Sequence, residues 1–139
     1  MRVLIDTNVL LDVLMGRQPY YDISDNILKL CSDKKIEGYI AAHSISNMYY
    51  ILRKHMPEDV RRKALLDVCR ILKVEGIDSV KILSALQKED FVDLEDCLQE
   101  ECAMAISADY IVTRNIKDFA TSDIPAIMPD EFLSKVLKQ

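Results

Sequence analysis

The sequence is poor in the two residues that interrupt regular structure. Its 139 residues include only three glycines and four prolines, and half of all residues are hydrophobic. This composition excludes fibrous and disordered chains. No stretch approaches the roughly 18 apolar residues that a membrane span needs, because Asp6 and Asp12 interrupt the first apolar run. No charged-then-apolar secretion signal is present either, so we expect a globular protein that is neither exported nor membrane-embedded.

Metal-binding spacings of cysteine and histidine are also missing. The four cysteines form no CxxC pair, and a chain of this length needs no disulfide bonds. They are Cys31, Cys69, Cys97 and Cys102. His43 and His55 are too far apart, and too different in their settings, for a two-histidine metal site. We therefore predict reduced thiols in a cytoplasmic protein, and no histidine in a catalytic role.

Positive charge is in short supply. The 18 Lys and Arg residues against 23 Asp and Glu residues give a formal net charge of −5 at pH 7. An acidic chain repels phosphate, so a nucleic-acid partner needs a local basic surface or bound cations. The densest basic cluster is either a solvated face or a phosphate track. It joins Arg53, Lys54, Arg61, Arg62 and Lys63.

What the sequence does have is short apolar runs that alternate with amphipathic segments. The runs predict strands, with a turn or a further short strand over residues 74–77. The predicted strands cover residues 3–5, 39–42, 110–113 and 125–128. Alternation of this kind predicts an α/β fold with three layers (α/β/α) around a central, mainly parallel sheet. The length suits a single domain over residues 1–139.

Capping residues bound the predicted helices. The first helix is predicted to end at Gly16 and the second at Gly38, while Asp78 is predicted to cap a later one. A helix within residues 90–108 is predicted to turn its apolar side chains inward. These side chains are Leu94, Cys97, Leu98, Cys102 and Ala105.

Polar side chains follow three of the predicted strands. They are Asp6 after the first strand, Ser44 and Asn47 after the second, and Arg114, Asn115 and Asp118 after the third. Asp93, Glu95 and Asp96 lie at the start of the helix that leads into the third strand. Because ligands bind beyond the carboxyl ends of parallel strands, we expect these groups to converge.

Converging carboxylates favour a hard divalent cation, because Mg²⁺ and Mn²⁺ prefer oxygen ligands. Such a cation would activate a water molecule for in-line attack on a phosphodiester. Other interpretations stay open at this point. Asp6 could be a plain helix N-cap, and the three later acids could form an acidic first turn that complements the helix dipole.

Three ordered stretches resemble the PIN domain, the ribonuclease fold of the VapC-type toxins. They are IDTNVLLD, AAHSISNMYYILRK and DLEDCLQEECAMAISADYIVTRNIKDF, which together span nearly the whole chain. The resemblance implies an endoribonuclease that depends on Mg²⁺ or Mn²⁺ and leaves a 5′-phosphate. It also implies a homodimer and an antitoxin partner that holds the enzyme inactive.

By the same resemblance, Asp6 is the first acid of the metal site, Asp96 the third, and Asp118, or the Asn115 position, the fourth. The second acid of the family is usually a glutamate, but Asn47 stands at that position, and an amide is a neutral ligand at best. Asp93 or Glu95 could supply the missing charge. We prefer Asp93 because it lies one helical turn before Asp96.

The candidate residues therefore fall into three groups. The catalytic candidates are Asp6, Asn47, Asp96 and Asp118; the metal ligands are Asp6, Asp93, Asp96 and Asp118; and the candidates for binding substrate are Asn8, Thr113, Arg114 and Asn115.

Two rival functions stay open. Asn47 and the net acidity are compatible with a PIN-like module that cleaves weakly or not at all, and that binds RNA or a protein partner. A different α/β metal enzyme, such as a phosphatase for a small phosphoester, is the second rival.

Overall fold

The computed structural model, which describes residues 1–91 and 93–138, contains a five-stranded parallel sheet with β1 at its centre. The strand order is β3-β2-β1-β4-β5. The strands are β1 (Arg2–Ile5), β2 (Glu37–Ala41), β3 (Lys73–Glu75), β4 (Tyr110–Val112) and β5 (Ala126–Ile127). All strands point the same way, so their carboxyl ends share one edge of the sheet.

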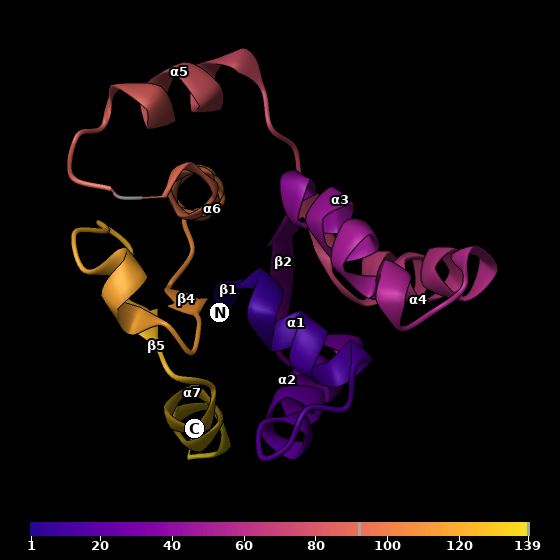
Figure 1. The fold of residues 1–139 in the computed structure, drawn as a ribbon. Coiled ribbons are helices and arrows are strands. Elements are labelled where there is room, and N and C mark those ends of the chain that lie inside the picture. The colour runs from indigo at the N-terminus through magenta and orange to yellow at the C-terminus, as the bar shows by residue number, and fades with distance from the viewer. Residues whose placement is uncertain (92, 139) are drawn as a thin grey trace.

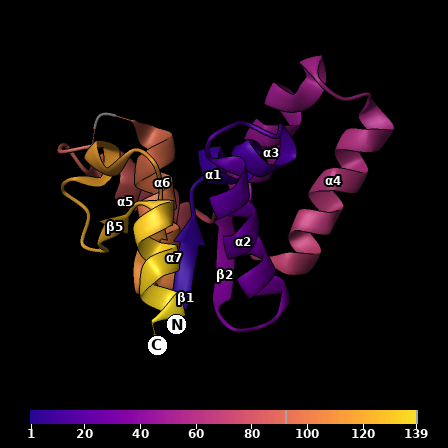
Figure 2. The ribbon, with the colours of Figure 1, turned by 90° about the horizontal axis from the view of Figure 1, so that it is seen from below.

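Helices cover both faces of this sheet. They are α1 (Thr7–Leu14), α2 (Tyr21–Ser32), α3 (Ala42–Ile51), α4 (Glu58–Ile71), α5 (Ser79–Gln87), α6 (Leu94–Ala105) and α7 (Pro129–Leu137), with short 3-10 helices η1 (Leu52–Lys54) and η2 (Ile116–Phe119). In Figure 1, α5 lies outside α6, on the side away from the sheet. In Figure 2, α3 and α4 extend away from α5, α6 and α7. No helix in the described ranges is long and apolar enough to cross a membrane.

The alternation of side chains along β1 divides the core in two. Val3 and Ile5 belong to the larger cluster, which α1, α2, α3, α4 and α7 help to form. Leu4 points to the opposite face and packs with Cys102 and Ala103 of α6. β1 is fully buried on both faces from Val3 to Ile5, as expected for the central strand of a parallel sheet. The predicted three-layer α/β/α class is confirmed.

Most of the predicted elements are also present. Residues 74–77, predicted as a turn or a short strand, overlap the edge strand β3. The Asp78 carboxylate caps α5 by accepting a hydrogen bond from the Lys81 backbone N–H at 2.9 Å. Gly16 follows α1 with a φ of +62°, the left-handed conformation that makes glycine a good helix terminator.

The prediction that Gly38 ends the second helix is wrong. The helix α2 ends at Ser32, and Lys34 takes the left-handed conformation, with a φ of 60°. Gly38 lies inside β2 instead, where the chain passes close to α2 and α4. A Cβ atom there would lie 2.5 Å from Cys31 Sγ and 2.6 Å from Leu72 Cδ2, so this position has no room for a side chain.

The predicted inward face of α6 is only partly correct. Cys97 and Cys102 are buried, but Leu94 is 46% exposed and Ala105 is exposed as well. Three polar side chains are buried on α6 that hydrophobic periodicity did not indicate: Gln99, Glu100 and Glu101. Because α6 lies between the sheet and α5, two sides of the helix are covered, so more of its positions are buried than a one-sided apolar pattern predicts. Val92, inside the predicted helix, lies outside the described residues.

Replacement of Gly38 by alanine tests the close approach of β2 to α2 and α4. The new methyl group must displace the Cys31 and Leu72 side chains, and overpacking of this kind costs about 1–3 kcal/mol. We expect Gly38→Ala to lower the free energy of unfolding by this amount in urea denaturation. Gly76→Ala is the matched control, because a Cβ at Gly76 meets nothing within 4 Å. Equal effects of the two substitutions would contradict the packing described for Gly38.

Candidate active site

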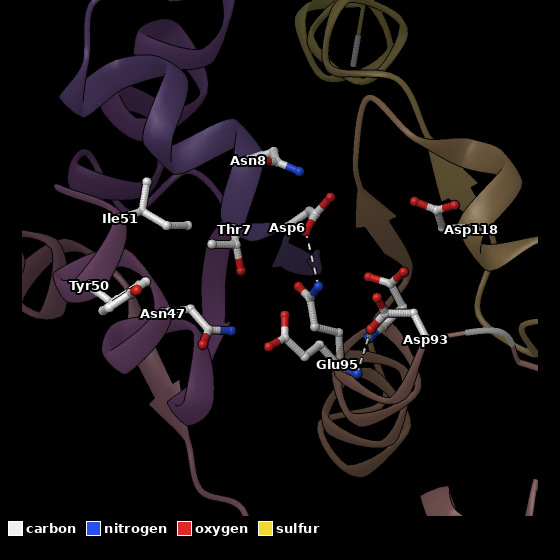
Figure 3. A pocket seen from close by; sticks show the side chains of 11 residues that line it. Asp6, Thr7, Asn8, Asn47, Tyr50, Ile51, Asp93, Glu95 and Asp118 are labelled. Atoms are coloured by element: carbon white, nitrogen blue, oxygen red, sulfur yellow. Dashed lines mark hydrogen bonds between the residues drawn. The ribbon is translucent and has the colours of Figure 1, made fainter. Parts of the chain in front are cut away.

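A pocket of about 390 Å³ opens at the carboxyl edge of the sheet. It is lined by Asp6, Thr7, Asn8, Asn47, Tyr50, Ile51, Asp93, Glu95, Asp96, Gln99 and Asp118. Six of these residues belong to the three candidate groups, and a seventh, Glu95, was the alternative to Asp93. They come from the end of β1, from α1 and α3, from the N-cap and first turn of α6, and from η2. Figure 3 shows Asp93 and Asp118 on one side of the pocket and Asn47, Tyr50 and Ile51 on the other, with Asp6 between them.

Asp6 holds the centre of this pocket. Its residue occupies the N-cap position of α1, but its carboxylate makes no capping hydrogen bond. Instead Oδ1 accepts a hydrogen bond from Gln99 Nε2 at 2.9 Å, and Oδ2 accepts one from the Thr113 hydroxyl at 2.8 Å. Asp6 is only 4% exposed. The interpretation of Asp6 as a plain helix cap therefore fails, because its side chain joins β1 to α6 and β4.

Asp93 is a true helix cap. Its Oδ1 atom accepts hydrogen bonds from the backbone N–H groups of Glu95 at 2.7 Å and Asp96 at 3.3 Å. These bonds satisfy two of the donors that the first turn of α6 leaves open. One oxygen of Asp93 is thus committed to the backbone, while the residue still lines the pocket.

The field around Asp96 is strongly negative. Burial, as the largest cause, and the nearby carboxylates of Asp93, Asp6, Asp118 and Glu95, in that order, together raise the pKa of the Asp96 carboxyl group to about 7. No Lys or Arg belongs to the pocket lining in the described part of the chain. A carboxyl group with a pKa this high resists ionisation until a positive charge arrives.

The donor set around the pocket fits a hard divalent cation. The polar lining consists of carboxylate, amide and hydroxyl groups, whose oxygens are the ligands that Mg²⁺ and Mn²⁺ take. Gln99 adds a buried carbonyl oxygen, Oε1, that lacks a hydrogen-bond donor within residues 1–91 and 93–138. Among those residues, no three His, Cys, Asp or Glu side chains lie close enough to hold an ion as they stand. Because unneutralised carboxylates repel, we expect a bound cation to draw them together.

The candidates after β4 do not all reach the pocket. Thr113 is fully buried and contacts Asp6, whereas Asn115 is exposed and donates its backbone N–H to the Thr113 hydroxyl at 2.9 Å. Arg114 points away from the pocket lining. Its Nε and Nη2 atoms donate to the two carboxylate oxygens of Asp12 at 2.7 and 3.1 Å, and its guanidinium lies 4.0 Å from the centre of the Tyr20 ring.

Asp12 and Gln99 are the residues that sequence reasoning missed. Asp12 is fully buried in α1, and its bidentate pair with Arg114 fixes the segment that leads from β4 to Asp118. No local signal links two residues so far apart in sequence. Gln99 could have been found, because it lies three residues after Asp96 and so shares a face of α6 with it.

The α3 residues that line the pocket are uncharged. Tyr50 is 63% exposed, and outside the lining the Arg53 guanidinium of η1 lies 3.6 Å from the centre of its ring. Tyr49 is only partly exposed, and Arg61 of α4 lies 4.3 Å from the centre of its ring and donates to its backbone carbonyl at 3.0 Å. The Thr7 hydroxyl donates to Ser44 Oγ at 2.7 Å and ties α1 to α3 below these side chains.

Comparison with known proteins identifies similar domains. A family model described as the PIN domain matches residues 2–117. No curated protein matches the sequence. Among solved structures, a toxin-antitoxin complex from Klebsiella pneumoniae is 25% identical, with a TM-score of 0.67, over 91% of this chain and 97% of that chain.

Two further structures share the fold at lower identity. VapBC2 from Rickettsia felis, bound to a DNA fragment from its promoter, is 19% identical, with a TM-score of 0.67, over 92% of this chain and 98% of that chain. VapC20 from Mycobacterium tuberculosis, described as a Sarcin-Ricin loop cleaving toxin, is 10% identical, with a TM-score of 0.67, over 88% of this chain and 95% of that chain.

The buried pair of Asp12 and Arg114 is predicted to matter for stability. Asp12→Asn leaves the half-buried guanidinium without its anion, and breaking a buried pair in this way costs about 3–5 kcal/mol. Urea denaturation measures the loss. Asp25→Asn is the control, since Asp25 pairs with Lys29 on the surface of α2 and such pairs contribute at most about 1 kcal/mol. A loss for Asp12→Asn no larger than that of the control contradicts the prediction.

The raised pKa of Asp96 predicts a pH dependence of stability in metal-free protein. The folded state holds the proton up to a pKa of about 7, above the ordinary value of 3.8 for the unfolded chain. The contribution to stability is therefore fully present below about pH 4 and is lost as the pH rises through 7. In EDTA, we expect the wild type to lose more unfolding free energy between pH 5 and pH 8 than Asp96→Asn, which cannot titrate. Parallel pH profiles would exclude this effect.

Proposed function

Since the chain belongs to the PIN domain family, we propose that it is a divalent-cation-dependent endoribonuclease that acts as the toxin of a type II toxin–antitoxin pair. We further propose that residues 1–139 form one PIN-like domain, that the cation is Mg²⁺ or Mn²⁺ and that the substrate is RNA. Asp6, Asp96 and Asp118 would hold the cation, with Asp93 and Asn47 beside it.

One observation carries this proposal. Carboxylates from the end of β1, the first turn of α6 and the 3-10 helix η2 line a single pocket that has no basic residue in its described lining. Residues this far apart in sequence have no structural reason to gather negative charge at one place, since the repulsion destabilises the fold. Binding of a cation is the function that offsets this cost.

The residues around Asp6 support a catalytic role for it. The donated hydrogen bonds of Gln99 and Thr113 fix both oxygens of its carboxylate, so the rotamer of Asp6 is set before any ligand arrives. A bound divalent cation would supply an activated water molecule and would offset negative charge that develops on the phosphate. Asp96 and Asp118 face the same pocket and would share that cation with Asp6. Asn8 lines the pocket and is available to donate to a phosphate oxygen.

The α3 side of the pocket supports RNA as the substrate. Exposed tyrosine rings stack on bases, and arginine contacts phosphates, so the exposed pair Tyr50–Arg53 at the end of α3 forms a strip suited to a single-stranded segment. Tyr50 belongs to both this strip and the pocket lining. A strand held along α3 would therefore pass directly over the carboxylates.

The proposed partners rest on charge and apolar surface. A basic antitoxin segment would complement a pocket that has five carboxylates in its lining. The outer face of α5 is strongly apolar, with Val80 71%, Leu83 59% and Leu86 62% exposed, and this supports a homodimer. We place the protein in the cytoplasm, where its proposed RNA substrate is found.

An inactive module is the second candidate function. It is favoured by the uncharged wall of α3, where Asn47 supplies an amide, and by the spacing of the described acids, no three of which lie close enough to hold an ion as they stand. Such a module would bind RNA or a protein partner without cleaving it. Binding of Mn²⁺ together with turnover of RNA separates the enzyme from the module.

Asp6→Asn provides the direct test of the proposed enzyme. Loss of one central charge is expected to weaken Mn²⁺ binding roughly 10- to 100-fold and to lower the rate of RNA cleavage about 100- to 1,000-fold. Isothermal titration calorimetry measures the first effect, and a fluorescent RNA cleavage assay measures the second. Asp109→Asn is the charge-matched control, since Asp109 lies outside the pocket lining, where it accepts the Arg2 backbone N–H.

The choice of substrate gives a second check on the same assay. A ribonuclease is expected to cleave structured RNA and to leave a small aryl phosphate intact, because the latter cannot engage the strip along α3. Turnover of the aryl phosphate alone would identify a phosphatase instead. RNA binding without any turnover, in the presence of Mn²⁺, would identify the inactive module.

A further inference from the structure

The acids at the start of α6 turn toward opposite sides of the pocket. Consecutive residues of a helix point about 100° apart, so the side chains of Glu95 and Asp96 reach the pocket from different directions. Figure 3 shows Glu95 reaching away from Asp93 and Asp118, toward Asn47 on α3. Both Glu95 and Asn47 line the pocket. Glu95 is thus the carboxylate that extends to the otherwise uncharged side.

The carboxylate of Glu95 is free to bind a ligand. It enters no salt bridge with residues 1–91 and 93–138. The backbone of the residue, by contrast, is fixed: its N–H donates to Asp93, and its carbonyl oxygen lies 3.1 Å from His43 Nε2. The side chain therefore extends from an anchored point. Asp93 differs, because one of its oxygens already accepts two backbone hydrogen bonds.

A second, independent observation points to a ligand in the pocket. Gln99 is only 3% exposed, and its amide orientation is set by the hydrogen bond from Nε2 to Asp6. Its Oε1 atom is left buried without a donor in the described ranges. A flipped amide would place that oxygen against the Asp6 carboxylate, which is repulsive. A buried acceptor without a donor is unfavourable, and a hydrated ligand in the pocket would supply one.

We propose that Glu95 is a further ligand of the divalent cation, and that it provides the negative charge on the side of the pocket where α3 presents only Asn47. This inference rests on the proposed function, since it concerns the same cation. Asp93, the other candidate for this charge, already caps α6 through one of its oxygens, whereas the carboxylate of Glu95 has no such role. Moving the negative charge from Glu95 on α6 to position 47 on α3 is then expected to preserve cation binding, because the two side chains face each other across the pocket.

The charge-exchange experiment measures Mn²⁺ affinity by isothermal titration calorimetry, without RNA. Glu95→Gln is expected to weaken binding roughly 10-fold or more. The double variant Glu95→Gln with Asn47→Glu is expected to return the affinity to within about three-fold of wild type, and Asn47→Glu alone is expected to tighten binding. Glu131→Gln, an exposed position on α7 with the same loss of charge, is expected to bind like wild type.

The outcomes separate this inference from the proposed function. Wild-type affinity in Glu95→Gln, with Asp6→Asn still impaired, would overturn the role of Glu95 and leave the proposed function standing. Failure of the double variant to recover, with its fold verified by circular dichroism in EDTA, would also overturn it. Absence of Mn²⁺ binding in the wild type would overturn both proposals. Loss in Glu95→Gln together with recovery in the double variant supports the inference.

Discussion

The structure depends on how a carboxylate is held at the end of the most deeply buried strand. β1 is flanked by β2 and β4 and covered on both faces. The residue that follows it is therefore buried and not exposed to solvent. Asp6 fills that position, with one neutral donor from α6 and one from Thr113 after β4. Burial of a charge with only neutral donors is costly. The fold therefore accepts this cost and holds a negative charge at the edge where the parallel strands end.

Another residue of α6, Glu100, helps to position the walls of the same pocket. Glu100 is 1% exposed, and its two oxygens accept hydrogen bonds from Lys88 Nζ and from the Asp123 backbone N–H. Lys88 precedes the segment that leads to Asp93, and Asp123 follows the helix η2 that carries Asp118. A single buried carboxylate thereby fastens the two segments that flank the acidic side of the pocket. Glu100 is therefore buried because it holds these two segments, and not because it packs a core.

Sequence patterns were sufficient to predict the fold class and most of the residues that line the pocket. The strands were predictable because short β-branched runs suit a sheet covered on both faces, and Asp6, Asn47, Asp96 and Asp118 were predictable because strand exits in such a sheet share one edge. Gly38 shows where this reasoning fails. Its local sequence matches a helix terminator, but the lack of a side chain is required by α2 and α4, which only the tertiary structure brings near.

Arg114 and Gln99 show a second limit of sequence reasoning. An arginine after a strand at the ligand-binding edge is a reasonable phosphate contact, yet the structure directs it to the fully buried Asp12, whose carboxylate otherwise has, among the described residues, only the longer contact of 3.5 Å with Arg17. Gln99 escaped notice because a glutamine within an apolar helix pattern resembles an exposed residue. Its importance arises from Asp6, which is 93 positions away in sequence.

The charge distribution also fixes the order in which ligands arrive. The pocket lining has five carboxylates and, in the described part of the chain, no basic side chain, whereas the neighbouring strip carries Arg53. A phosphate that approaches the carboxylates without a cation meets repulsion from each of them, and the net charge of −5 adds to it. Under the proposed function, RNA would be held first along the strip, and its backbone would enter the pocket only after the cation is bound. The proposed cation would then be required for substrate placement as well as for the chemical step, and loss of any carboxylate that holds it would impair both.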